Sequence, residues 1–381
     1  MSSLLGEEEN YTGTVVTRKQ IKRDYPGKVE WNLPRPNELI DGEAKRIRSE
    51  QRKKIKSELK SAIDSDIKDT NADNTEPISR TSEFSLPKRR GTVSIAVPAS
   101  IIDLCQILEL KTIVAGQISR IASMFMVDEI VVFRDMENKK GQLVKADEFL
   151  AKVLQYQETP QYLKKAIFPF CKELQFVGLL SPLEIPSHVH KNEFLKYREG
   201  VVTETITTGN KGSFVDVGLD TRTVLIPQMI QKGVRVTIQF DNGINLKSKT
   251  LTGKAVSPLL PRGDLGLYWG YRTRAAESLQ TVFDSCPYKE GYDITIGIST
   301  KSKQYTIDPE FQLPSYQHLM IVFGGAEGIE EAIEADEHIK THDPASLFTY
   351  FLNPIYSRGC RNVRTEEMIS MTLSTLQINY N

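Results

Sequence analysis

Cysteines are few in this chain, and no two of them are close together. The 381 residues include four cysteines, at positions Cys105, Cys171, Cys286 and Cys360. Zinc ribbons need cysteine pairs such as CxxC, and disulfide frameworks need a denser cysteine pattern. The scattered pattern therefore argues against both kinds of site and fits a reducing compartment.

Long apolar runs and an excess of one charge are also missing. No apolar stretch is long enough to cross a bilayer, and the first residues, MSSLLGEEEN, lack the basic and apolar regions of a secretory signal. The 49 basic and 49 acidic residues cancel, so net charge predicts no partner. We therefore expect no membrane contact, and the length predicts two or three globular domains.

The usual catalytic motifs are absent as well. The stretch FGGAEG (323–328) follows a predicted strand, but its glycines lack the GxGxxG spacing of dinucleotide-binding folds. There is no Gly-Lys-Ser/Thr phosphate loop and no GxSxG elbow. The histidines of HVH (188–190) have no set of further ligands nearby, so we predict no metal site.

The first 91 residues differ in composition from the rest. They are rich in charged and small polar residues, and GEAKRIRSEQRKKIKSELK (42–60) and PKRR (87–90) are basic clusters. These clusters fit a basic arm for RNA binding or nuclear import, and they fit a solvated charged helix equally well. We predict that 1–91 is largely disordered.

An α/β pattern begins at residue 92 and continues to 199. Apolar, β-branched runs at 91–98 and 128–135 predict buried strands, and LELKTIVAGQISRIASMFM (108–126) between them predicts a helix. A further helical pattern at 150–168 is broken at Pro160. Alternating strands and helices predict a parallel sheet.

Short strands replace this pattern over 200–262. Five runs with glycine or proline at their edges predict a small antiparallel barrel or sandwich. GSFVDVGL (212–219) resembles a strand of S1-type OB barrels, which bind single-stranded nucleic acid. Phe214 could be a base platform, although a place in the core is favoured. The basic residues available for RNA are Arg222, Lys232 and Arg235.

The α/β pattern returns over 263–381, so the barrel is predicted to be inserted into one α/β domain. The stretch 270–286 predicts an amphipathic helix, and 292–300 and 318–323 predict strands. Near the end, Gly359 permits unusual backbone angles, and Asn362 is placed to cap the helix that follows.

Three glycine turns follow strands or extended segments in this last part. They contain Gly297, then Gly324, Gly325 and Gly328, and finally Gly359. Such turns expose backbone groups that can bind an adenine edge and a ribose. Each one taken alone also fits an ordinary loop glycine.

In chain order, five segments resemble the SPOUT class of RNA methyltransferases, and more closely its archaeal and eukaryotic members with an inserted OB barrel. The segments are LKTIVAGQISRIASMFMVDEIVVF, LYWGYRTRAAESL, GYDITIGIST, IVFGGAEGIEEA and RNVRTEEMI. The resemblance covers 92–381. It implies that the C-terminal segment threads through an earlier loop to form a trefoil knot, a feature almost absent from other proteins. It also implies S-adenosylmethionine as the cofactor, bound in a cleft between the knotted loops.

The resemblance assigns roles to particular residues. Arg120 matches the catalytic arginine of the first motif, and Val114 stands where many ribose-methylating members have asparagine, which favours methylation of a base. Arg364 joins the basic residues of the barrel as an RNA-binding candidate, and a solvated role for it is equally open. The cofactor-binding residues implied are Gly297, Ser299, Gly324, Gly325, Gly328, Gly359, Asn362 and Val363.

The resemblance implies that the chain methylates a base, for example at uridine N3, in a structured RNA such as ribosomal RNA. Arg120 would stabilise the base anion that forms when the proton leaves, although an ordinary surface salt bridge is the alternative. Members of the class pair, so a homodimer is expected, located in the nucleus and specifically the nucleolus, with the cytoplasm as the alternative. The competing function is a non-catalytic ribosome assembly factor that retains the fold; a dehydrogenase is a weaker alternative.

Overall fold

The computed structural model describes most of the chain beyond residue 90. The described residues are 91–136, 145–191, 193, 195–206, 212–219, 222–240, 250–306, 308, 311–341 and 343–376. The predicted charged arm over 1–91 therefore lies outside the described residues, except for Gly91, and it stays a prediction.

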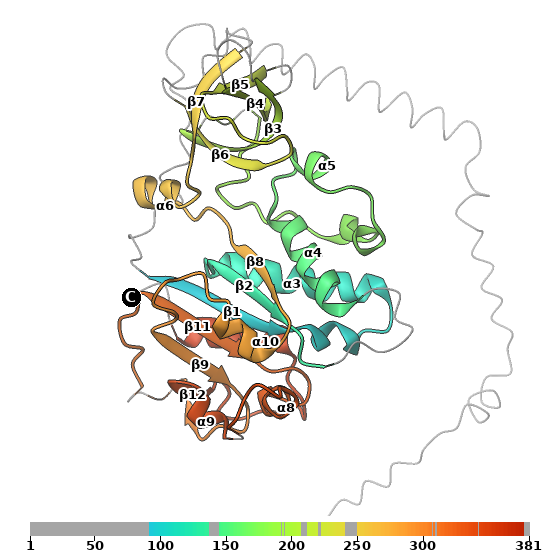
Figure 1. Ribbon diagram of the computed structural model, residues 1–381. Helices are drawn as coiled ribbons and strands as arrows, with labels where there is room; N and C mark the ends of the chain where they lie inside the picture. The colour runs from blue at the N-terminus through green and yellow to red at the C-terminus, as the bar shows by residue number, and fades with distance from the viewer. Residues whose placement is uncertain are drawn as a thin grey trace, which may run out of the picture. The chain divides into compact units, whose positions relative to one another are not determined.

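Seven strands of the described residues form one parallel sheet, in the order β10-β12-β9-β11-β1-β2-β8 (Figure 1). Every neighbouring pair runs in the same direction, as the alternating pattern of the sequence predicts. The strands are β1 (Thr92–Pro98), β2 (Glu129–Phe133), β8 (Arg272–Ala276), β9 (Ile294–Ile298), β10 (Gln304–Tyr305), β11 (His318–Phe323) and β12 (Tyr350–Asn353).

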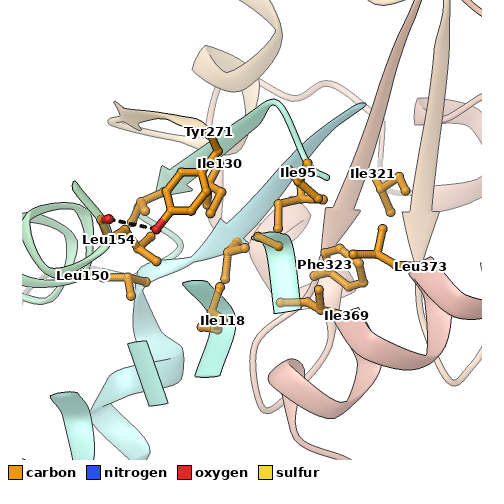
Figure 2. Packing of buried hydrophobic residues seen from close by; sticks show 14 of the residues in the cluster. Ile95, Ile118, Ile130, Leu150, Leu154, Tyr271, Ile321, Phe323, Ile369 and Leu373 are labelled. Atoms are coloured by element: carbon orange, nitrogen blue, oxygen red, sulfur yellow. Dashed lines mark hydrogen bonds between the residues drawn. The ribbon is translucent and has the colours of Figure 1, made fainter. Parts of the chain in front are cut away.

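Helices cover one face of this sheet around a large apolar core. Helix α3 (Leu108–Met124) packs against α4 (Ala146–Glu158) and α10 (Thr365–Thr375), because apolar residues recur at helical spacing on the inner side of each. Figure 2 shows how Ile95 and Ile321 of the sheet meet Ile118 of α3 and Ile369 of α10 in this core, all of them fully buried.

The opposite face of the sheet is also covered. Met320 and Val322 alternate with Leu319 and Ile321 along β11 and belong to a second core, since successive strand residues point to opposite faces. The helices on this side are α7 (Leu279–Asp284), α8 (Ile329–Ala335) and α9 (Pro344–Leu347). Burial on both faces explains why the strands are almost continuously apolar.

Five strands between the two halves of the α/β domain close into a barrel, in the order β3-β4-β5-β7-β6 (Figure 1). The barrel strands span Tyr197 to Val256, whereas the sequence predicts an insertion over 200–262. This arrangement confirms an α/β domain interrupted by a small barrel; threading of the C-terminus stays a prediction. The strands are β3 (Tyr197–Ile206), β4 (Gly212–Leu219), β5 (Arg222–Ile226), β6 (Arg235–Phe240) and β7 (Thr250–Val256).

Short helices complete the described elements. A 3-10 helix, η1 (Ala99–Leu104), follows β1, and α5 (Lys164–Ile167) follows the break at Pro160 that the sequence predicts. Two 3-10 turns, η2 (Lys172–Leu174) and η3 (Val177–Leu179), lead toward the barrel, and α6 (Leu260–Leu265) leads out of it.

Two local predictions are wrong. The helix expected over 270–286 is strand β8 followed by α7: β8 pairs with β2 along the sheet edge, and the Ser278 hydroxyl accepts from the Thr281 amide to begin α7. Pairing with the sheet here overrides the local helical pattern. Phe214 was favoured as core, but it alternates with the buried Val215 and Val217 and so lies on the other face of β4.

Candidate functional site

The predicted glycine turns meet at one edge of the sheet. Strand β9 lies between β11 and β12 and runs parallel to both, so the loops that follow the three strands share the carboxyl edge. In open α/β sheets this edge is where ligands bind. The structure therefore brings together the loops 299–303, 324–328 and 354–364.

The central turn, 324–328, cannot be built without glycine. A Cβ on Gly324 would lie 2.2 Å from the Ile329 amide nitrogen, and Gly328 has a φ of 101°, a region that favours glycine. The Gly328 amide donates to the Gly325 carbonyl at 3.2 Å. The Gly324 carbonyl accepts from Thr365 Oγ1 at 3.0 Å, which fastens the turn to the start of α10.

A buried aspartate and a half-buried serine form a pair beside this turn. Asp135, after β2, accepts from the Ser100 amide at 3.0 Å and from the Ser100 hydroxyl. A Cβ on Gly325 would lie 2.7 Å from Ser100 Oγ. Burial raises the pKa of Asp135, although both hydrogen bonds from Ser100 oppose the rise. The sequence did not lead us to this pair, although an acid two residues after the buried run EIVVF was a visible signal.

Ser299 and Gly297 both have structural uses within the fold. The Ser299 hydroxyl donates to Glu330 Oε1 at 2.6 Å and accepts from the Lys301 amide at 3.1 Å. A Cβ on Gly297 would lie 2.4 Å from a carbon of the Phe348 ring. Packing against Phe348 is thus a sufficient reason for glycine at 297, and the cofactor roles of both residues stay predictions.

The last residue of β12 fixes the start of the loop that follows, and the loop then becomes exposed. Asn353 Nδ2 donates to the Thr300 carbonyl at 3.0 Å, and its Oδ1 accepts from the Ile355 amide at 2.9 Å. Residues 356–362 are all exposed. A Cβ on Gly359 would meet no atom within 4 Å, and its φ is outside the left-handed region. The structure therefore makes no use of the backbone freedom that Gly359 permits, and its role in binding the cofactor stays a prediction.

Helix α10 does not begin in the predicted way. Its N-cap is Arg364, whose amide donates to Glu367 Oε2 at 2.9 Å. Asn362 lies two residues too early to cap, and it is exposed, whereas Val363 packs partly against the core. The cap comes from an acid in the first helical turn, which satisfies an amide that the helix leaves free.

Arg120 lies on the exposed face of α3. Among the described residues its side chain has no hydrogen bond and no ion pair, so the ordinary salt bridge of the alternative interpretation is not present there. Leu110, Ile113 and Met124 occupy the same face at helical spacing and are 47%, 38% and 63% exposed. The catalytic candidate thus belongs to an apolar stripe that faces outward.

The predicted RNA-binding residues differ in how accessible they are. Lys232, in the loop between β5 and β6, and Arg364, at the start of α10, are exposed. Arg222 lies on β5, and its side chain is outside the described residues. Arg235 is engaged within the fold: it donates to Glu199 at 2.7 Å and to both oxygens of Glu158 at 2.6 and 2.9 Å. These contacts occupy the Arg235 guanidinium within the fold.

The two HVH histidines differ in their surroundings. His188 Nε2 donates to the Glu158 carbonyl at 2.7 Å, and burial lowers the pKa of His188 to about 4. His190 is exposed. Within the described ranges no cluster of three or more histidine, cysteine or acidic side chains could hold a metal ion, and no helix is long and apolar enough to span a membrane.

Comparison with known proteins finds a family match across both structural parts. A family model described as "Putative RNA methyltransferase" matches residues 92–376, the α/β domain together with the barrel. The mouse protein named 28S rRNA (uridine-N(3))-methyltransferase is 42% identical over 299 residues, which are 75% of this chain and 76% of the mouse protein. The human protein of that name is 41% identical over 296 residues, 75% of this chain and 78% of its own length. The Drosophila melanogaster protein of that name is 38% identical over 303 residues, which are 75% of this chain and 62% of the Drosophila protein.

Proposed function

The chain belongs to this RNA methyltransferase family, and from that membership we propose that it methylates N3 of a uridine in large-subunit ribosomal RNA. The observation that carries the proposal is the identity to three named uridine-N(3)-methyltransferases, which extends over the α/β domain and the barrel alike. The sequence has neither the GxSxG elbow nor the phosphate-loop motif. This is consistent with methyl transfer, which depends mainly on positioning the donor and the acceptor.

The carboxyl edge of the sheet fits S-adenosylmethionine as the methyl donor. Gly324, Gly325 and Gly328 are only partly buried and carry no side chain that could block approach to their backbone groups. The loop 354–364, which is exposed over 356–362, lies at the same edge. These segments would hold the donor through main-chain groups. When bound, the sulfonium supplies a methyl group that is already activated for attack.

Uridine N3 carries a proton at neutral pH, so the chain must favour its loss. We assign Arg120 to this task, because a guanidinium stays charged and can donate two hydrogen bonds to the anion of the base. Its side chain is exposed and has no partner among the described residues, which leaves it available to RNA. If an Arg120→Ala variant bound donor and RNA but methylated at the normal rate, this assignment would fail.

The exposed face of α3 supports a homodimer. Leu110, Ile113 and Met124 form an outward apolar stripe, and such stripes mark contact surfaces. A second copy of the chain is the occupant we propose, since it would bring Arg120 of one protomer to the site of its partner. Light scattering should give twice the chain mass, and Ile113→Lys should halve it. A wild-type monomer at micromolar concentration would refute the pairing.

Two measurements test the proposed function. Calorimetric titration with S-adenosylmethionine should show one site per chain, whereas no binding would favour a non-catalytic RNA-binding factor. Mass spectrometry of nucleosides should show less N3-methyluridine in ribosomal RNA from cells that lack the protein. An unchanged N3-methyluridine content would contradict the proposal.

A further inference from the structure

The loop that leads into α10 carries an unusual set of side chains. Over 353–365, NPIYSRGCRNVRT, the chain has three arginines and no acid. Arg358 and Arg361 are exposed, and Tyr356 is 73% exposed. Within the described residues neither of these two arginines has an ion pair. A large aromatic ring and unpaired cations are thus presented together to solvent.

The loop after β9 adds to the same surface. Strand β10 pairs with β12, which places Tyr305 opposite Asn353. The Thr306 amide donates to the Asn353 carbonyl at 3.0 Å, and the rings of Tyr305 and Tyr356 are 5.2 Å apart at 57°. Lys303, two residues before Tyr305, is exposed. Backbone pairing and the ring contact therefore hold the two loops against each other.

This combination matches the chemistry of unpaired RNA. Cations contact phosphates, and an exposed aromatic ring offers a face on which any base can stack. We propose that Tyr356, Arg358, Arg361 and Lys303, here called the Tyr356 surface, bind a single-stranded RNA segment, with one base on Tyr356 and phosphates on the arginines. The inference rests on the proposed function, and it places RNA at the sheet edge that carries the glycine turn.

Binding of a labelled single-stranded oligouridylate to the full chain tests this, measured by fluorescence anisotropy. Tyr356→Ala should weaken binding about tenfold, in the range for loss of one stacked base, whereas Tyr356→Phe should bind like the wild type. Arg358→Ala should lower the slope of log affinity against log salt by about 0.7, the change for one phosphate on a single strand. Thermal melts establish that each variant is folded.

Lys289 provides a matched control. It is an exposed cation in the loop before β9, at the opposite edge of the sheet. Lys289→Ala should leave affinity and salt slope unchanged. The inference is overturned if Tyr356→Ala and Arg358→Ala both bind within twofold of the wild type, or if Lys289→Ala weakens binding as much as they do. Displacement of the RNA by polyglutamate at equal charge concentration would also overturn the inference. Polyglutamate has negative charges and no bases, so it would show that charge alone, without stacking, binds the RNA.

Failure of this inference can be told apart from failure of the proposed function. If wild-type chain methylates ribosomal RNA and Tyr356→Ala does so with unchanged affinity for RNA, only the Tyr356 surface is refuted. If the wild type binds the oligonucleotide through Tyr356 and transfers no methyl group to ribosomal RNA, only the proposed function is refuted.

Discussion

Replacing Arg235 with methionine would leave two buried carboxylates without their cation, where the barrel meets the α/β domain. Arg235 of β6 contacts Glu158 of α4 and Glu199 of β3 with N–O distances of 2.6 and 2.7 Å, and the two acids are 10% and 4% exposed. Glu199 Oε1 also accepts from Thr237 at 2.6 Å and from the Trp269 indole at 2.6 Å. The network therefore links helix α4 to the barrel.

The expected loss can be bounded. Removing one member of a buried ion pair costs about 3–5 kcal/mol, and Arg235, with 27% of its side chain exposed, should fall near the lower end. Protonation of Glu158 limits the loss, because burial raises the pKa of this group to about 7 even with Arg235 present. Without the arginine the pKa rises further. The destabilisation should therefore be smaller at pH 6 and grow as the pH rises toward 8.

Urea unfolding followed by tryptophan fluorescence measures this, because Trp269 belongs to the network. Lys232→Met, which removes an exposed cation from the barrel, should cost less than about 0.5 kcal/mol. The double variant Arg235→Met with Glu158→Gln should recover part of the loss. The reasoning is refuted if Arg235→Met keeps wild-type stability and instead weakens RNA binding, as the sequence alone had suggested.

Three further substitutions test other parts of the fold. Gly297→Ala should lower the free energy of unfolding by about 1–3 kcal/mol through overpacking against Phe348; an unchanged melting temperature would contradict it. His188 has a pKa of about 4 in the folded chain and about 6.5 in the unfolded chain. The neutral imidazole therefore contributes its full share of the free energy of unfolding above pH 6.5, and about 3 kcal/mol of that share is lost as the pH falls toward 4. His188→Gln should flatten that part of the stability profile, and a profile like the wild type would show that other groups cause it. Thr365→Val removes the hydrogen bond to Gly324. It should lower the free energy of unfolding by about 1 kcal/mol and weaken binding of the methyl donor in calorimetry. Wild-type donor affinity would indicate that the turn does not need this hydrogen bond.

Strands and long helices were predictable because their signals are local. The run TVSIAVP and the helical spacing of α3 each contain the pattern that the structure shows, and both faces of the sheet accept apolar residues. The order of the two α/β halves around the barrel followed from the same patterns. Strand β8 was missed because its pairing with β2 depends on residues more than a hundred positions away.

The site was harder to predict because its contacts join distant segments. Ser100 belongs to η1 after β1, and Asp135 follows β2, so the two meet beside Gly325 only in the folded chain. Arg235 looked like a free cation, since nothing in its neighbourhood in the sequence shows that Glu158 will reach it. The sequence could not show whether the backbone freedom of Gly359 is used, because a glycine in an exposed loop leaves the same sequence signal as one that a tight turn requires.

One reaction tests the proposed methylation most directly. Purified chain, ribosomal RNA and S-adenosylmethionine with an isotopically labelled methyl group should be incubated together, and the RNA digested to nucleosides for mass spectrometry. We expect label in N3-methyluridine, and loss of that signal with Arg120→Ala. Label on a ribose oxygen, or no transfer by a chain that binds both donor and RNA, would contradict it.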